Sequence, residues 1–359
     1  MRILIYRLGS LGDWCVALPA LRAVRQRYPE AQIALLTNFP VAARAASAIS
    51  ILDNTGLIDE FIAYPVGTRN PWRLLSLLVN LRRSKFDVVV NLAAWRGATK
   101  TKRDATFFYL AGIRERIGFS PVDGELNYQA DGMAEPEAAR LLRRIPRSQP
   151  SDLTSIESYG FVLTDSDRQW AKQILTASGI DTDFIAVSLG TKVPAKDWGE
   201  ENWCGLLKQL GQRYPKIAVV FIGAADERER SQRCGAHWPS KVLNLCGSCT
   251  PRQSAAVLAR ARLFIGHDSG PMHLAAAVGT RCVAIFSARA PAGQWFPLGA
   301  GHRVIYHKTD CYGCGLDVCT EQKKKCILSI TVDEVISTVK DILDSSTVAK
   351  LSHLRILRN

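Results

Sequence analysis

The first residues of the chain whose types and spacing could do chemistry follow its first apolar run. The segment Arg7-Leu8-Gly9-Ser10-Leu11-Gly12-Asp13 joins this run to a helical pattern. Its glycines let the backbone approach a ligand closely. Their G-x-x-G spacing differs from the G-x-G-x-x-G of dinucleotide-binding loops, which argues against a nicotinamide-dependent oxidoreductase. Asp13 stands where a helix should begin, so its carboxylate is either a general base or a helix cap, and the segment alone leaves both open.

A second candidate segment, residues 188–198, lies between an apolar run and a helical pattern. It contains a glycine, the hydroxyl of Thr191 and the ammonium groups of Lys192 and Lys196. Because a hydroxyl donates a hydrogen bond and an ammonium group supplies a point charge, this segment suits a phosphate group. The alternative is a solvated loop whose lysines bind nothing.

A third segment, residues 264–273, joins an apolar run to a helix that Pro271 should open, since proline suits the first helical position. The small residues before it leave N–H groups open at the positive end of the helix dipole, which favours a diphosphate. The residues predicted to bind this group are Asp268, Ser269, Gly270 and His273. For Asp268, an ordinary turn residue is the alternative.

Two further groups of residues are candidates for binding. Four closely spaced cysteines predict a structural zinc or iron site, with free thiols and disulfides as the alternatives: Cys311, Cys314, Cys319 and Cys326. Four other cysteines fall within helix or strand patterns and are predicted to be small core residues: Cys15, Cys204, Cys234 and Cys282. Basic residues after the apolar run at 87–92 are predicted to lie on a loop, where they bind an acidic acceptor or are simply solvated: Arg96, Lys100, Lys102 and Arg103.

The composition restricts the class of protein that carries these residues. The chain has 359 residues, a net charge of +13 and 47% hydrophobic residues. These values are typical of a globular protein and exclude a disordered chain, a fibrous repeat and a disulfide miniprotein. The positive charge favours anionic partners, while the lack of zinc-finger, RRM and KH signatures argues against nucleic acid. No signal peptide or membrane span is predicted, so a cytoplasmic location is expected.

Alternating strand and helix patterns predict an α/β chain with two doubly wound parallel sheets. In the first half, strands are predicted at 1–7, 33–37, 61–64 and 87–92, and helices at 14–28, 41–49 and 71–84. In the second half, strands are predicted at 184–189, 217–223, 242–245, 263–267 and 282–286, and helices at 167–178, 200–214, 227–234, 252–259, 271–278 and 331–343. The predicted division is a domain at 1–150, a linker at 151–166, a domain at 167–343 and a basic tail at 344–359. The ligand site is expected in a cleft between the domains, at the carboxyl ends of the strands.

Three segments, in this order, resemble the lipopolysaccharide heptosyltransferases of glycosyltransferase family 9. They are RLGSLGDWCVALPALRAVRQRYPEAQIALLTN, GTKVPAKDWGEENW and GHDSGPMHLAAAVGTRCVAIFSARAP. The resemblance implies a GT-B fold, in which two Rossmann-like domains bind the acceptor (N-terminal) and the nucleotide-sugar (C-terminal). It also implies inverting transfer of a heptose from ADP-heptose to a core sugar of lipopolysaccharide, with no metal or other cofactor in the chemistry.

The resemblance also implies roles for individual residues. Asp13 matches the catalytic carboxylate of the family. From their position in the sequence, rather than from the resemblance, Gly9, Ser10, Gly12 and the four basic residues at 96–103 are predicted to lie on the acceptor side. Thr191 and Lys196 match the groups that hold the donor phosphates, and Asp268 to Gly270 with His273 match the donor-binding turn. Lys192, whose spacing matches only loosely, is expected to assist Lys196. Here the acidic residue expected to bind the adenosine ribose is displaced, and Asp226 is the candidate. In autotransporter-type relatives, a cluster similar to Cys311–Cys326 looks like an iron-binding one.

The expected partners are an ADP-sugar and an anionic glycolipid of the lipid A/Kdo type. Peripheral contact with the cytoplasmic face of the inner membrane is expected through the basic and apolar residues 350–359. One alternative is another nucleotide-sugar, or a protein acceptor such as an exported autotransporter adhesin. A second alternative is a nucleotide-sugar-binding protein without activity. The combination of Asp13, Lys196 and Asp268 argues against the second, because a binding protein needs no base.

Overall fold

The computed structural model describes residues 1–38, 47–64, 67, 70–120, 122–146, 152–181 and 183–356, with side chains as far as 344. It divides into two units. Unit 1 comprises Met1–Val162 and Gly293–Gly299, and unit 2 comprises Leu163–Ala292 and Ala300–Asn359. The boundary therefore falls after Val162, and a short segment of the second half of the chain belongs to the first unit. Part of the predicted linker, residue 151, lies outside the described residues.

Unit 1 is built on a five-stranded parallel sheet with the strand order β3-β2-β1-β4-β5. Its strands are β1 (Arg2–Tyr6), β2 (Gln32–Asn38), β3 (Glu60–Tyr64), β4 (Val88–Asn91) and β5 (Glu115–Ile117). The central strand β1 is apolar and buried from Ile3 onward, and Ile3 pairs with Ile33 on one side and Val88 on the other. Such continuous apolar strands are typical of parallel sheets covered on both faces.

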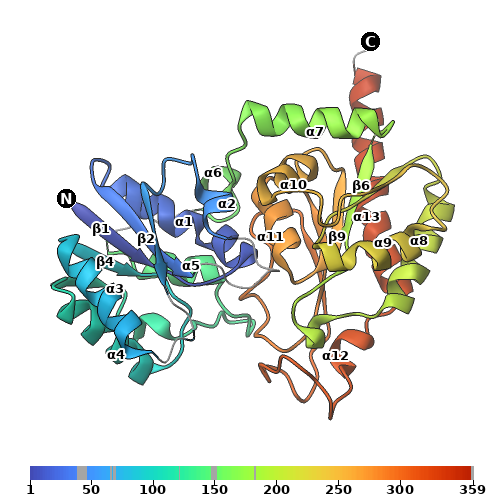
Figure 1. Cartoon of the computed structure of the whole chain (residues 1–359). Helices are drawn as coiled ribbons and strands as arrows, with labels where there is room; N and C mark the ends of the chain where they lie inside the picture. The colour runs from blue at the N-terminus through green and yellow to red at the C-terminus, as the bar shows by residue number, and fades with distance from the viewer. Residues whose placement is uncertain are drawn as a thin grey trace. The chain divides into compact units, whose positions relative to one another are not determined.

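Helices cover both faces of this sheet. The helices are α1 (Leu11–Arg27), α2 (Ile49–Leu52), α3 (Pro71–Arg83), α4 (Ala98–Leu110), α5 (Glu137–Arg143) and α6 (Ile156–Tyr159), with a 3₁₀ turn η1 (Val122–Gly124). Helices α1, α5 and α6 pack together on one face, and α3 and α4 lie side by side on the other (Figure 1). Most of the helix predicted at 41–49 lies outside the described residues, and the sequence patterns missed α4, β5, α5 and α6.

Unit 2 contains a six-stranded parallel sheet with the order β11-β10-β9-β6-β7-β8. Its strands are β6 (Phe184–Ser188), β7 (Ala218–Phe221), β8 (Val242–Asn244), β9 (Leu263–His267), β10 (Cys282–Phe286) and β11 (Arg303–Tyr306). Strands β6 and β9 are neighbours, with Ser188 paired to Gly266, although 78 residues of sequence separate the two. The segments that follow β6 and β9 therefore emerge side by side at one edge of the sheet.

The helices of unit 2 also form two layers. They are α7 (Asp165–Ala177), α8 (Glu200–Arg213), α9 (Arg228–Gly235), α10 (Pro251–Leu258), α11 (Gly270–Ala277), α12 (Lys325–Leu328) and α13 (Val332–Ile356), with 3₁₀ turns η2 (Pro194–Lys196) and η3 (Ala225–Glu227). Helix α8 packs against α9 and α13 on one face, and α10 packs against α7 and α11 on the other (Figure 1). Helix α13 continues far beyond its predicted end, into the segment predicted as a tail. Within the part of the chain that is described, no helix combines the length and the apolar character of a membrane span.

Candidate active site

Asp13 is the third residue of α1, and its side chain faces back toward the start of that helix. Its Oδ2 accepts hydrogen bonds from the Ser10 backbone N–H at 2.8 Å and from the Ser10 hydroxyl at 3.3 Å. Asp13 therefore performs part of the capping function considered for it, although Ser10 is the N-cap residue itself. The carboxylate remains 27% exposed, so it is accessible to a ligand as well.

Arg7, which sequence reasoning did not single out, holds the main chain at Asp13. Its guanidinium is 1% exposed and donates to the Asp13 carbonyl at 2.7 and 3.0 Å and to the Leu92 carbonyl at 2.5 Å. A second contact places Arg7 Nη2 3.7 Å from Asp13 Oδ1. A buried guanidinium needs several acceptors to offset its desolvation. Because these acceptors belong to the segments after β1 and β4, the hydrogen bonds of Arg7 hold the two segments in place.

Gly9 makes room for the Asp13 carboxylate. A Cβ atom at Gly9 would lie 2.4 Å from Asp13 Cβ and 2.9 Å from Asp13 Oδ2, which is too close for any side chain. The Gly9 backbone is held in turn by buried Asn38, whose Oδ1 accepts from the Gly9 N–H at 2.9 Å. Asn38 ends β2, beside β1, so the parallel sheet positions it at this loop. Gly12 lies in the first turn of α1.

The basic residues predicted on a loop at 96–103 are mostly helical, which corrects that expectation. Lys100, Lys102 and Arg103 belong to α4, because the segment from Ala98 has no helix-breaking residue. Asp104 pairs with Arg96 at 2.5 Å and with Arg103 at 2.9 Å, and Arg96 also donates to the Tyr6 hydroxyl at 3.2 Å. Lys100 and Lys102 are exposed.

In unit 2, a lysine and an aspartate from the second and third predicted segments form an ion pair. Lys196, at the end of η2, places its Nζ 2.6 Å from Asp268 Oδ2, and the two side chains are 16% and 7% exposed. His273 Nε2 lies 3.6 Å from the other carboxylate oxygen of Asp268. Burial alone would raise the pKa of Asp268, but the charge of Lys196 and the hydrogen bond from His273 outweigh it and lower that pKa to about 2.

Hydroxyl groups without partners accompany this ion pair. Among the described residues, the buried hydroxyls of Ser188, Ser269 and Ser287 lack a hydrogen-bond partner. They follow or end the adjacent strands β6, β9 and β10, and Ser269 is the N-cap residue of α11 although its side chain does not cap that helix. A buried hydroxyl without a partner costs free energy, so three of them beside a helix N-terminus and a lysine suit a bound anion. Thr191 and exposed Lys192 lie on the loop after β6.

Of the two neighbouring carboxylates in η3, Glu227 rather than the predicted Asp226 reaches the loops at this edge of the sheet. Asp226 is exposed, whereas Glu227 extends between the loops that follow β6 and β7. A Cβ atom at Gly190 would lie 1.9 Å from Glu227 Oε1, and one at Gly223 would lie 2.0 Å from Glu227 Oε2. The 3₁₀ turn η3 rotates successive side chains by about a third of a turn, so a shift of one residue decides which carboxylate faces the loops.

A sequence profile of glycosyltransferase family 9 (heptosyltransferase) matches residues 74–325. The chain belongs to glycosyltransferase family 9. It is therefore a transferase, and its two parallel α/β sheets are those of the GT-B fold, as the sequence resemblance implied.

Individual relatives and solved structures match this family 9 member along nearly its whole length. Lipooligosaccharide heptosyltransferase 2 of Campylobacter jejuni is 32% identical over 351 residues, covering 96% of this chain and 99% of that protein. A family 9 glycosyltransferase from Veillonella parvula superposes with a TM-score of 0.72 at 20% identity, covering 96% and 97% of the two chains. The E. coli ADP-heptose lps heptosyltransferase II superposes with a TM-score of 0.66 at 19% identity, covering 97% and 100%.

The cysteine cluster of this glycosyltransferase does not form a ready metal site. Residues 311–326 are all described, and no three of their ligand atoms lie within 4.8 Å of one another. A tetrahedral ion bound at about 2.3 Å needs sulfur atoms about 3.8 Å apart, so the loop would have to rearrange. A solved iron-containing glycosyltransferase, TibC of enterotoxigenic E. coli, shares the fold with a TM-score of 0.52 at 15% identity, covering 96% of this chain and 76% of that one.

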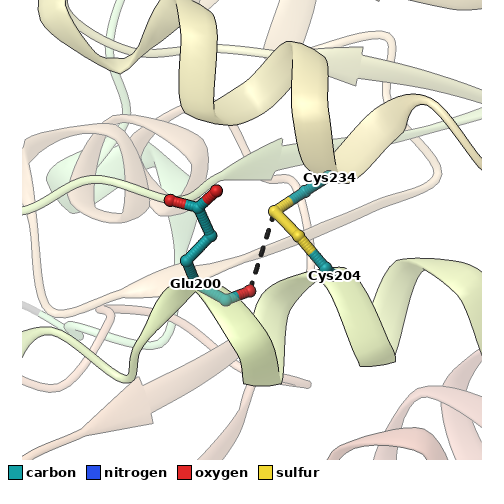
Figure 2. Close-up of side chains that lie close together, drawn as sticks. All are labelled: Glu200, Cys204 and Cys234. Carbon is teal, nitrogen blue, oxygen red and sulfur yellow. Dashed lines mark hydrogen bonds between the residues drawn. A yellow bond between two sulfur atoms is a disulfide. The ribbon is translucent and has the colours of Figure 1, made fainter.

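A different pair of cysteines is joined in a disulfide, which corrects the prediction of separate core thiols. Cys204 of α8 is bonded to Cys234 of α9, next to Glu200 (Figure 2). Among the described residues, these three form the one group of potential metal ligands. The Glu200 carboxylate is already paired with Arg233 at 2.7 and 3.0 Å, and disulfide sulfurs are no longer thiolates. This group therefore connects α8 and α9 and is not a metal site.

His267, which ends β9 just before Asp268, contacts the segment that contains Lys196 and the helix that follows it. Its Nε2 accepts hydrogen bonds from the Trp198 backbone N–H at 3.0 Å and from the Trp203 indole N–H at 3.3 Å. The imidazole is fully buried, and burial lowers its pKa from 6.5 to about 4. His267 is therefore neutral in the folded protein at neutral pH and links η2 to the end of β9.

We expect this buried histidine to make the stability of unit 2 depend on pH. In the unfolded chain His267 becomes protonated below its ordinary pKa of 6.5, whereas in the folded protein it stays neutral until about 4. The free energy of unfolding should therefore fall as the pH decreases through this window, by about 2 kcal/mol between about pH 7 and about pH 5. Urea unfolding followed by tryptophan fluorescence measures this decrease. His267→Gln keeps an acceptor for Trp198 but does not titrate, so an equal decrease in that variant would contradict the assignment.

Proposed function

We propose that this glycosyltransferase transfers a heptose from ADP-heptose to a sugar hydroxyl of the lipopolysaccharide core, with inversion at the anomeric carbon. The observation that carries the proposal is the pairing of Lys196 with Asp268 beside the α11 N-terminus and three hydroxyls without partners. The names of the relatives supply the sugar and the acceptor, since they include lipooligosaccharide heptosyltransferase 2 and ADP-heptose lps heptosyltransferase II.

Unit 2 supplies the donor site in this proposal. Breaking the bond between the anomeric carbon and the diphosphate leaves negative charge on the departing ADP. Lys196, Thr191, Ser269 and the N–H groups at the start of α11 stabilise that charge electrostatically, so the chemistry needs no further cation. Asp268 orients the Lys196 ammonium group, and the resemblance to the family places it near the transferred sugar. Lys192, exposed on the same loop, adds positive charge.

Glu227 is the carboxylate that we assign to the adenosine ribose. Glu227 lies between the loops after β6 and β7. At the corresponding place in Rossmann-like sheets, an acidic side chain of the protein binds the ribose hydroxyls of the nucleotide. Asp226, the exposed residue immediately before Glu227, is the control position for testing this assignment. This assignment replaces the sequence-based candidate within the same short turn.

Unit 1 supplies the base and the acceptor site. The acceptor hydroxyl must lose its proton as it attacks the anomeric carbon, and Asp13 accepts that proton. We assign this role to Asp13 Oδ1, because Ser10 already occupies Oδ2. A single carboxylate acting on the acceptor fits direct displacement with inversion, by the logic known for glycosidases. The exposed Lys100 and Lys102 suit an anionic glycolipid of the lipid A/Kdo type at the cytoplasmic face of the inner membrane.

The cysteine cluster has no part in this chemistry. A zinc or iron ion at Cys311–Cys326, if the loop rearranges to bind one, would be structural. The C-terminal segment expected to contact the membrane lies beyond the residues whose side chains are described.

The donor proposal predicts that ADP stabilises the protein in the presence of EDTA. ADP at about 100 times its Kd should add about 2.7 kcal/mol to the free energy of unfolding, which raises Tm by several degrees. UDP and GDP should have smaller effects. Differential scanning fluorimetry measures the shift, and stabilisation that appears only with Mg²⁺ would contradict the role given to Lys196.

The same assay tests the ribose assignment with a matched pair of variants. Glu227→Gln should weaken the ADP effect at a fixed nucleotide concentration, because a neutral amide is a poorer acceptor for ribose hydroxyls. Asp226→Asn should leave it unchanged. The opposite result would restore Asp226 as the ribose ligand.

A further inference from the structure

Helix α3 of unit 1 is apolar on its outer side as well as on its inner side. Leu77 and Leu81 are buried toward the sheet, as expected for a helix that covers it. On the opposite side, Trp72, Leu75 and Val79 are 74%, 47% and 36% exposed. Their spacing of three and four residues aligns them in one stripe along the helix. Isolated exposed apolar residues are ordinary, but an aligned stripe indicates a surface that binds something.

A groove between α3 and α4 extends this stripe. Its volume is about 430 Å³, and every side chain that lines it is apolar: Pro71, Trp72, Leu74, Leu75, Leu78 and Phe107. Close to Phe107, at the C-terminal end of α4, Tyr109 and Leu110 are 60% and 53% exposed. Figure 1 shows α3 and α4 side by side on one face of the sheet, so these exposed residues belong to two neighbouring helices.

The same two helices are strongly basic. Their basic residues are Arg73, Arg82, Arg83, Lys100, Lys102 and Arg103. Asp104 is the one acidic residue in their sequences, and its carboxylate is neutralised by Arg96 and Arg103. The outer surface of α3 and α4 therefore combines exposed tryptophan, tyrosine and leucine with a surplus of positive charge.

We propose that the outer surface of α3 and α4 docks on an anionic lipid bilayer, with acyl chains entering the apolar groove. Exposed tryptophan and tyrosine suit the interface between headgroups and acyl chains, and lysine and arginine around them are attracted to anionic headgroups. A second copy of the chain is a poorer occupant, because two such surfaces would bring like charges together. This inference rests on the proposed function in one respect, namely that the acceptor is anchored in a membrane.

The topology connects this surface to the base. Helices α3 and α4 begin after the carboxyl ends of β3 and β4, and the loop that leads to Asp13 follows the carboxyl end of β1. All three strands are parallel, so the first turns of α3 and α4 lie at the same edge of the sheet as this loop. A bilayer under α3 and α4 would keep a membrane-anchored sugar at the edge where Asp13 lies.

The test is flotation of the full-length chain with vesicles. Phosphatidylcholine vesicles that contain phosphatidylglycerol should bind the chain, pure phosphatidylcholine vesicles should bind it weakly, and binding should weaken with salt. The double variant Trp72→Ser/Leu75→Ser should lower the partition coefficient roughly tenfold or more, because it removes the two most exposed apolar groups of the stripe. Val122→Ser/Tyr128→Ser is the matched control, since Val122 and Tyr128 are 67% and 58% exposed in the same unit but outside α3 and α4.

Activity measurements separate this proposal from the proposed function. Trp72→Ser/Leu75→Ser should keep its turnover on a water-soluble fragment of the acceptor and lose it on the same acceptor embedded in vesicles. Equal vesicle binding by this variant and the control would overturn the docking surface, even if transfer to the soluble fragment is normal. The proposal would also be overturned, in favour of a second copy of the chain, if sedimentation showed that the unmodified protein is a dimer and the variant a monomer. Vesicle binding needs no substrate, so it remains decisive if heptose transfer itself is not found.

Discussion

Asp13→Asn should lower turnover by roughly 10²–10⁴, the usual contribution of a general base. Asparagine has nearly the same size as aspartate, and its amide oxygen can still accept from the Ser10 backbone N–H, which Asp13 Oδ2 holds at 2.8 Å. The substitution therefore keeps the start of α1 and the space beside Gly9 while removing the group that accepts the proton. Turnover with saturating ADP-heptose and acceptor measures the effect.

Asp13→Ala is the companion variant that separates the base from the cap. It should lose the same activity and also about 1 kcal/mol of stability, because the hydrogen bonds to Ser10 disappear. Binding of ADP should be unchanged in both variants, since the donor site is assigned to unit 2. Near-normal turnover in Asp13→Asn, together with a lower Tm in Asp13→Ala, would show that Asp13 is only a cap.

Lys196→Met should lower kcat/KM by roughly 10²–10³ and weaken ADP binding. Removing one preorganised electrostatic group from a developing anion costs about this much in other enzymes. The variant also leaves Asp268, which is 7% exposed, without the cation 2.6 Å away that keeps its pKa low. Part of the lost affinity will therefore come from a carboxylate that repels the diphosphate. Kinetics and calorimetric titration with ADP measure the two effects.

Lys208→Met is the matched control for Lys196→Met, because Lys208 is exposed on α8 of the same unit. It removes the same charge from the chain without touching the Lys196–Asp268 pair, so its kinetics should equal those of the unmodified protein. Activity of Lys196→Met within about threefold of Lys208→Met would contradict the assignment, as would unchanged ADP affinity. Asp13→Asn and Lys196→Met should therefore be distinguishable: Asp13→Asn affects turnover alone, and Lys196→Met affects both turnover and donor binding.

Much of the fold was predictable because its signals are local. Alternating apolar strands and amphipathic helices gave the parallel α/β architecture of both units, and most observed elements lie within a few residues of their predicted positions. The failures are elements with weaker patterns. Helix α4 follows a glycine and is largely polar in its first half, and β5 has three residues, so neither presents a periodic apolar signal.

The candidate site was predictable in part for the same reason. Asp13, Lys196 and Asp268 each lie in the segment that runs from an apolar strand through the first turn of the helix that follows it, and this arrangement is visible along the chain. Arg7 and Asn38 gave no such signal, because their role is to hold other segments by contacts with the Asp13 and Leu92 carbonyls and the Gly9 backbone. Nothing in the spacing of a single segment reveals a contact with another segment.

The sequence by itself determined the strand and helix pattern, the basic character and the residue types at the strand ends, because these depend on short-range periodicity and composition. Only the tertiary structure decided which strand ends are neighbours, since β6 and β9 pair across 78 residues and thereby bring Lys196 to Asp268. It also decided that Glu227 rather than Asp226 faces Gly190 and Gly223, and that Cys204 meets Cys234. The physical reason is that sheet order and the rotation of a single turn set side-chain neighbours at distances of a few ångströms, which sequence spacing does not specify.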